Sequence, residues 1–181
     1  GRRLMVRDAG DPSGVPLIYF HGTPGSRLDV SFGDESARAA GVRVISFDRP
    51  GYGRSEPAAD DLGSVARDAA ALADVLGVER FATLGWSGGG PFALAAAAEL
   101  GDRVTRVGLA CVLAPPQEMP GATDSFTDND RAALAFLPEE PARAAEQFRA
   151  GAEETLQALL RNMLADPYIL GVSGGASVGA V

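Results

Sequence analysis

A serine flanked by glycines is the most chemically suggestive residue of the chain. Residues 85–89 read G-W-S-G-G and match the G-x-S-x-G pattern, in which a sharp strand-to-helix turn exposes a serine hydroxyl. The apolar run Phe81–Leu84 precedes the pattern and the helix-like segment 91–100 follows it, as such a turn requires. We therefore predict a nucleophile elbow with Ser87 as the nucleophile. The alternatives are a glycine-rich phosphate loop and an ordinary tight turn.

A second motif, H-G-T-P-G-S over residues 21–26, directly follows the apolar run Val15–Phe20. A carbonyl group attacked by a serine becomes an oxyanion, and each fixed N–H group that meets it contributes about 3–4 kcal/mol. One donor is the backbone N–H after the nucleophile, here Gly88, and another comes from the loop after an earlier strand. Thr23 is our candidate for this second donor of an oxyanion hole. The alternative is that this segment only builds a turn.

The third motif is F-D-R-P-G-Y-G-R-S over residues 47–55, at the end of the apolar run Val42–Phe47. Its glycines at 51 and 53 superficially suggest phosphate binding. However, the third glycine and the following helix start of the dinucleotide fingerprint are absent. We interpret the motif as a structural loop near the mouth of the pocket.

Four continuous apolar runs indicate strands buried on both faces, as in parallel sheets: Val15–Phe20, Val42–Phe47, Phe81–Leu84 and Val107–Leu113. Three helical segments alternate with them, each before a glycine suited to a left-handed cap: Asp29–Ala40, Asp61–Leu76 and Gly90–Leu100. This alternation predicts an α/β fold with a mostly parallel sheet and flanking helices. The stretch Leu4–Val6, followed by a turn over 10–14, predicts part of an antiparallel hairpin.

The alternation stops after residue 113, so we predict a boundary between residues 1–114 and 115–181. Thr127 and Asp130 resemble a capping box before a helix over Ala132–Leu137, and Pro141 can start the next one. A later amphipathic helix is predicted from apolar residues at helical spacing: Leu156, Leu159, Leu160, Met163 and Leu164. The uncharged stretch 171–181 is interpreted as a loose end.

Taken in order, the three motifs resemble those of the α/β-hydrolase superfamily, in its cap-bearing, serine esterase-like branch, over about residues 1–165. The resemblance implies Ser87 as nucleophile, oxyanion donors at Thr23 and Gly88, and a partial helical cap that begins after Ala114. The related dehalogenases and epoxide hydrolases carry Asp at the nucleophile position, so Ser87 disfavours those activities. The other motif residues are expected to support the site: His21, Gly22, Gly85, Trp86 and Gly89.

The chain offers no obvious partners for this serine. The triad of this fold runs Ser, then Asp or Glu, then His, yet the one histidine, His21, precedes Ser87 and is expected to be structural. The later aspartates are expected to cap helices or face solvent: Asp124, Asp128, Asp130 and Asp166. Cys111 is predicted to be a small buried residue of its strand. No triad acid or base is therefore assigned.

A serine without its acid and base is a poor nucleophile, so we expect this chain alone to be inactive or nearly so. The simplest explanation is that it is a piece of a longer enzyme, with a sheet that is incomplete on its C-terminal side. That enzyme would hydrolyse an ester, thioester or amide through an acyl-enzyme. Two alternatives stay open: a natural short protein that binds a ligand or partner without catalysis, and completion of the site by another chain.

The composition of the chain narrows the possible binding partners, cellular compartment and cofactors. The 181 residues are 46% hydrophobic and 22% charged, which suits a packed domain. The net charge of −8 disfavours nucleic acid and anionic membranes as partners. One cysteine excludes an internal disulfide and, with no signal-peptide pattern, predicts a cytoplasmic protein. One histidine and one cysteine are too few for a usual zinc site, so we predict no metal and no cofactor. The expected acyl transfer to water predicts a small-molecule acyl substrate, which we expect to be apolar. The oligomeric state is left open.

Overall fold

The computed structural model describes residues 2–58, 61–112, 120–121, 124, 126–137, 139–151 and 153. The chain divides into two compact units, Gly1–Ala114 and Pro115–Val181. The three sequence motifs all lie in the first unit, so the site is built by that unit's sheet and helices.

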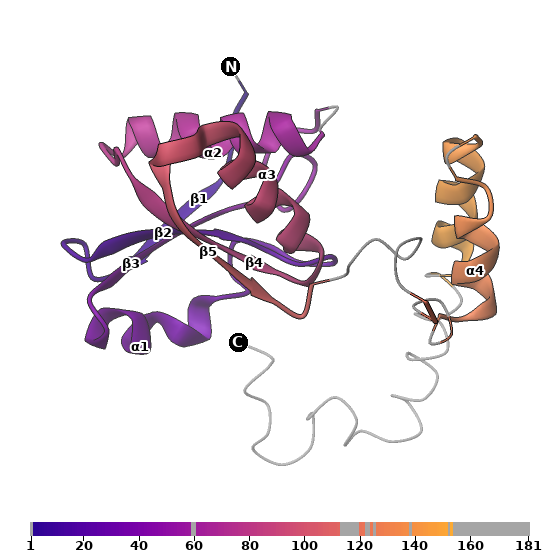
Figure 1. Ribbon diagram of the computed structural model, residues 1–181, viewed down its shortest axis with the longest axis horizontal. Coiled ribbons are helices and arrows are strands. Elements are labelled where there is room, and N and C mark those ends of the chain that lie inside the picture. The colour runs from indigo at the N-terminus through magenta and orange to yellow at the C-terminus, as the bar shows by residue number, and fades with distance from the viewer. Residues whose placement is uncertain are drawn as a thin grey trace, which may run out of the picture. The chain divides into compact units, whose positions relative to one another are not determined.

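Five strands of the first unit form one sheet, in the order β1-β3-β2-β4-β5 (Figure 1). Their bounds are β1 Val6–Gly10, β2 Val15–Phe20, β3 Val42–Phe47, β4 Phe81–Trp86 and β5 Val104–Ala110. β2 lies parallel between β3 and β4, and β5 continues the sheet parallel to β4. Only β1 runs antiparallel, against β3. The predicted mostly parallel sheet is therefore confirmed.

The pairing of the first strand differs from the predicted hairpin. β1 pairs with β3 and not with the strand that follows it in sequence, so the predicted hairpin is wrong: Val6 pairs with Phe47, and Ala9 with Val44. The reason is that both edges of β2 are already occupied by parallel partners, whereas β3 has a free edge for β1.

The last strand starts earlier than predicted. β5 begins at Val104, which pairs with Phe81 at the start of β4, and it ends at Ala110. Thr105 and Arg106 broke the apolar pattern because they are exposed on this edge of the sheet. Cys111 has a φ of 53° and has left the strand. It is exposed, so the prediction of a buried Cys111 is wrong.

Three helices flank the sheet: α1 Asp34–Ala39, α2 Leu62–Val75 and α3 Gly90–Leu100. Figure 1 shows α2 and α3 on one face of the sheet and α1 on the other. The predicted helix Asp29–Ala40 is shorter than expected, because a 3-10 turn over Ser31–Gly33 precedes α1. α2 begins where Asp61 accepts a 2.6 Å hydrogen bond from the Ser64 N–H, as a capping residue should.

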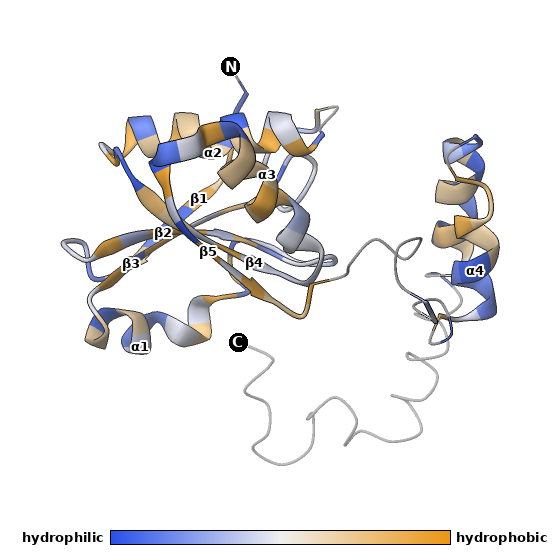
Figure 2. Cartoon of the chain, in the orientation of Figure 1, coloured by the Kyte–Doolittle hydropathy of each residue, from blue (hydrophilic) through white to orange (hydrophobic). Residues whose placement is uncertain are grey.

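The hydrophobic core lies between the sheet and the pair α2 and α3. The strands supply its large side chains: Ile18, Phe20, Ile45, Phe47 and Phe81. The helices supply mainly small ones, including Ala66, Ala69, Ala73, Ala93 and Ala96. Figure 2 shows hydrophilic residues on α2 interleaved with hydrophobic ones, as expected for a helix with one face on the core. The small residues let both helices pack closely on the sheet, which fixes the carboxyl ends of β2, β3 and β4 relative to one another.

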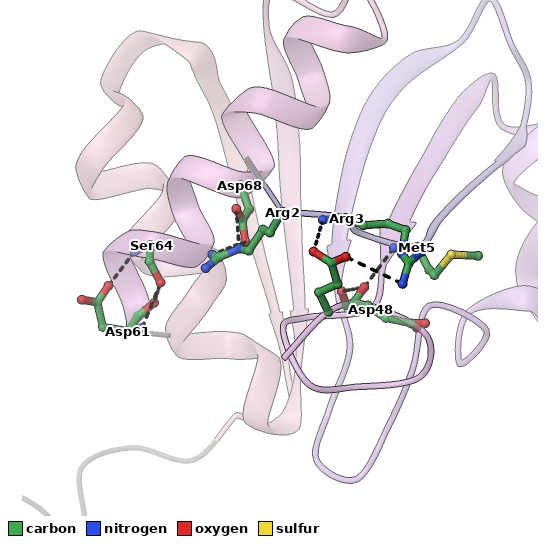
Figure 3. Close-up of polar contacts among 9 residues, drawn as sticks. Arg2, Arg3, Met5, Asp48, Asp61, Ser64 and Asp68 are labelled. Carbon is green, nitrogen blue, oxygen red and sulfur yellow. Dashed lines mark hydrogen bonds and ion pairs between the residues drawn. The ribbon is translucent and has the colours of Figure 1, made fainter. Parts of the chain in front are cut away.

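The N-terminal segment is tied down on two sides (Figure 3). The Arg2 guanidinium binds the Asp68 carboxylate on α2, with Nε donating to Oδ2 at 3.0 Å. The Met5 N–H donates to Ser55 Oγ at 2.9 Å, and the Met5 carbonyl accepts from the Asp48 N–H at 2.9 Å. The Arg2 contact joins the N-terminal segment to α2, and the Met5 contacts join it to the loop after β3.

The second unit contains helix α4, Asp128–Leu134, and a further helical segment over residues 141–151. The Thr127 hydroxyl accepts from the Asp130 N–H at 3.1 Å, so the predicted capping box is confirmed, although the helix begins earlier than expected. The helix start at Pro141 is also confirmed. The predicted helix with Leu156 to Leu164 and the stretch 171–181 lie outside the described residues. That 115–181 forms a cap stays a prediction.

Two glycines allow a controlled test of the helix terminators. Gly77, after α2, has a φ of 68°, and a methyl group added there would meet nothing within 4 Å. Gly77→Ala should therefore lower the free energy of unfolding by about 1–2 kcal/mol through left-handed strain alone. Gly33 has the same open space but a φ of −94°, so Gly33→Ala should change it by less than about 0.5 kcal/mol. Urea unfolding, followed by the fluorescence of the single tryptophan, measures both; equal effects would contradict the explanation.

Candidate functional site

Ser87 occupies a sharp bend between β4 and α3. β4 ends in extended geometry at Trp86, with φ −103° and ψ 127°, and Ser87 then has a φ of 49°. A 3-10 turn over Ser87–Gly89 leads into α3. A positive φ in a non-glycine residue costs on the order of 1–3 kcal/mol, and such strain is typical of functional positions. The half-buried Ser87 also lies at the start of α3, where the helix dipole favours negative charge.

Close packing explains the glycines around this bend. A methyl group added at Gly85 would lie 2.5 Å from the Gly90 Cα, and one added at Gly89 would lie 2.1 Å from the Phe20 carbonyl oxygen. A methyl group at Gly22 would lie 3.1 Å from Trp86 Cδ1 and 3.4 Å from Ser87 Cβ. The turn after β4 therefore packs directly against the end of β2 and the loop that follows it, with no room for side chains between them.

The sheet register brings the two predicted oxyanion donors together. Phe20 pairs with Gly85, so the loops after β2 and β4 leave the sheet at the same edge. A methyl group added at Gly88 would lie 3.4 Å from the Thr23 nitrogen and 2.9 Å from Thr23 Oγ1. Thr23 is exposed and Gly88 is half-buried. The Thr23 nitrogen thus lies close to Gly88, the residue that follows Ser87.

His21 is fully buried, and both of its ring nitrogens are engaged. Nδ1 lies 2.8 Å from the Gly22 carbonyl oxygen, to which it donates, and Nε2 accepts from the Arg49 N–H at 3.2 Å. Burial, more than any neighbouring group, lowers the pKa of His21, so the ring is neutral at pH 7. A ring held in this way supports the loop around residue 22 and offers no free nitrogen to Ser87.

Asp48 organises the loop that follows β3. Its buried carboxylate accepts from the Arg27 N–H at 2.8 Å, from Arg27 Nη1 at 2.6 Å and from the Arg54 N–H at 3.2 Å. Gly53 passes so close to this carboxylate, with a φ of 53°, that an added methyl group would lie 2.0 Å from Oδ2. Gly53 of the third motif thus leaves room for a carboxylate of the chain itself, whereas an added methyl group at Gly51 would meet nothing within 4 Å. These contacts join the loop after β3 to the loop after β2, because Arg27 belongs to the latter.

Arg49 is a buried residue that the sequence analysis did not single out. Its Nη2 donates to the Gly22 carbonyl oxygen at 3.1 Å and to Thr23 Oγ1 at 3.0 Å. Its guanidinium carbon lies 4.7 Å from the centre of the Tyr52 ring and 4.3 Å from that of Phe92. Arginine in a loop motif gives no local signal of this role, because its partners other than Tyr52 lie 26 to 43 positions away in sequence.

The aspartates after residue 114 are expected to cap helices or to face solvent. Asp124, Asp128 and Asp130 belong to the second unit, and Asp166 lies outside the described residues. Within the described ranges, no group of three or more histidine, cysteine or acidic side chains could hold a metal ion. Among the helices in that same part of the chain, none is both long and apolar enough to cross a membrane. The site therefore consists of a strained serine beside two candidate amide donors, on a braced pair of loops.

The family model described as "alpha/beta hydrolase fold" matches residues 15–168. The chain belongs to this family. It is 36% identical over 103 residues to a proline iminopeptidase of Xanthomonas citri, covering 53% of this chain and 32% of that protein. A non-heme chloroperoxidase of Streptomyces lividans is 34% identical over 92 residues, covering 50% of this chain and 33% of that protein.

Solved structures agree with the family. A thermophilic esterase from Thermogutta terrifontis superposes with a TM-score of 0.58 and 29% identity, covering 81% of this chain and 52% of that one. The chain therefore spans about one third of the length of these two curated relatives and about half of the length of this esterase.

Burial of His21 makes stability depend on pH. Because its pKa is lower in the folded than in the unfolded chain, its contribution is fully present above about pH 6.5 and is lost as the pH falls through the folded value. His21→Asn keeps a polar side chain without this titration. We expect the difference in unfolding free energy between wild type and this variant to shrink from pH 7.5 to pH 5, measured by urea unfolding. A difference that stays constant with pH would show that His21 does not titrate as argued.

Proposed function

We propose that this α/β-hydrolase sequence supplies the nucleophile and the oxyanion hole of a serine hydrolase that cleaves esters, thioesters or amides. The observation that carries the proposal is the positive φ of Ser87 at the bend between β4 and α3. Backbone strain at a serine beside two candidate N–H donors is costly, and it has a chemical use if the hydroxyl attacks a carbonyl group.

The proposed reaction begins when Ser87 Oγ attacks the carbonyl carbon of the substrate. A general base takes the hydroxyl proton, and the carbonyl π electrons move to oxygen to give a tetrahedral oxyanion. The N–H groups of Gly88 and Thr23 donate to that oxygen, and the N-terminal end of α3 favours its negative charge. Collapse expels the alcohol, thiol or amine, which takes a proton from the conjugate acid of the base. Water then hydrolyses the acyl-enzyme by the same route.

No residue of the chain is assigned as the general base or the acid of this reaction. The 181 residues hold one histidine, His21, and both of its ring nitrogens are occupied in the loop. We therefore propose that the chain alone hydrolyses substrates slowly or not at all. The chain also spans only part of its relatives' length, which supports an acid and a base contributed by further sequence of a longer protein. Completion by another chain, or a purely binding role, would be the other outcomes.

The substrate is proposed only as a class. The relatives carry names as different as iminopeptidase, chloroperoxidase and esterase, so the family does not fix the bond that is cleaved. An apolar acyl group remains our proposal, resting on the apolar side chains of the amphipathic helix predicted between Leu156 and Leu164. A small acyl ester with an activated leaving group, such as a p-nitrophenyl ester, is a suitable test substrate, because its leaving group departs without specific recognition by the enzyme.

A fluorophosphonate probe tests the nucleophile, because it phosphonylates activated serines and releases fluoride. We expect the probe to label the full-length protein that the gene encodes (the extended protein), and Ser87→Ala to abolish that labelling. The chain of 181 residues should label at least about 10³-fold more slowly, since triad removal leaves only residual activation.

Ser55→Ala is the matched control, because Ser55 is another serine of the same unit whose hydroxyl is used in structural hydrogen bonds. Its labelling should persist wherever the protein folds, as judged by circular dichroism. Labelling of the extended protein that survives Ser87→Ala, or none at all in the folded extended protein, would overturn the proposed function. The second result would favour a non-catalytic binding protein.

A further inference from the structure

The third motif carries an arginine whose arrangement the proposed reaction does not yet explain. Arg49 is only 3% exposed. Burying a guanidinium group is costly unless hydrogen bonds and favourable charge contacts compensate. We therefore asked which contacts compensate the burial of Arg49 and what those contacts hold in place.

Those contacts converge on the segment that carries the proposed Thr23 donor. Nη2 has two N–H bonds; one points to the Gly22 carbonyl oxygen at 3.1 Å and the other to Thr23 Oγ1 at 3.0 Å. The main-chain N–H of Arg49 donates to His21 Nε2 at 3.2 Å. Three consecutive residues of the loop after β2 are thus held by one residue of the loop after β3.

The same guanidinium reaches the elbow side of the site. It lies 4.3 Å from the ring centre of Phe92, in the first turn of α3, and 4.7 Å from that of Tyr52. Contacts with both rings limit the movement of the guanidinium group and therefore of its N–H donors. Arg49 thus contacts both the loop that carries Thr23 and the first turn of the helix that follows Ser87.

We propose that Arg49 is a positioning residue for the oxyanion hole: it holds Gly22 and Thr23 so that the Thr23 N–H meets the developing oxyanion. This inference rests on the proposed function. Without Arg49 the loop can keep its fold, through His21 and the Asp48 contacts, but the Thr23 N–H loses its fixed direction. Because the oxyanion exists only after attack, the loss falls on kcat and leaves KM nearly unchanged.

The test uses the extended protein and a p-nitrophenyl ester, with active sites counted by fluorophosphonate titration. For Arg49→Gln we expect kcat per active site to fall by about 10- to 100-fold, the range for a displaced catalytic group, with KM within about threefold. Arg54→Gln is the matched control, since Arg54 is an exposed arginine of the same loop. Its kcat should stay within about twofold of wild type. A purely structural role would lower the number of active sites and the melting temperature but not kcat per site.

A double-mutant cycle then identifies the path of the effect. Thr23→Val removes the hydroxyl that accepts from Arg49, without removing a buried charge, so it also serves if Arg49→Gln fails to fold. We expect Thr23→Val to lower kcat about tenfold, and the double variant to lose clearly less than the product of the two single losses. Multiplicative losses, or an unchanged kcat per site in Arg49→Gln or in Thr23→Val, would overturn the inference. Absence of any Ser87-dependent hydrolysis in the wild-type protein would instead overturn the proposed function, and the inference with it.

Discussion

The site depends on close approach between two backbone segments at the carboxyl edge of a parallel sheet. The turn after β4 holds Ser87 at a φ of 49°, and glycines let it pack against the end of β2, where an added methyl group would come within 2.1 Å of the Phe20 carbonyl oxygen. This contact has no tolerance for a larger residue. It brings Thr23 close to Gly88, the residue after Ser87, and the surrounding loops keep both in place.

The bracing of those loops explains why polar groups are buried here. Asp48 binds Arg27 and the loop after β3, His21 binds Gly22 and Arg49, and Arg49 binds Thr23. Each buried polar group is matched by a partner on another segment, so the segments cannot shift separately without leaving one of these groups unsatisfied. Rigid loops of this kind suit the role we propose, because an oxyanion hole works only when its donors are fixed in advance.

Local signals were enough to predict much of the fold. The predicted bounds are correct for β2, β3 and α3. They depend only on residues close in sequence, namely continuous apolar runs and the glycine that ends a helix. The partner of β1 and the start of β5 were mispredicted because they depend on which sheet edges are free. At the site, the motif glycines predicted the bend at Ser87, whereas the grip of Arg49 on Thr23 depends on packing between distant segments, for which the sequence holds no periodic or spacing signal.

The central claim is that the Gly88 and Thr23 amides face the oxygen of a group bonded to Ser87. A crystal structure of the protein phosphonylated at Ser87 tests it most directly, because the phosphoryl oxygen stands in for the oxyanion. We expect that oxygen to lie within about 2.7–3.1 Å of both main-chain nitrogens. A phosphoryl oxygen turned to solvent, or bound by other donors while Thr23 lies far from it, would show that the two amides do not form an oxyanion hole.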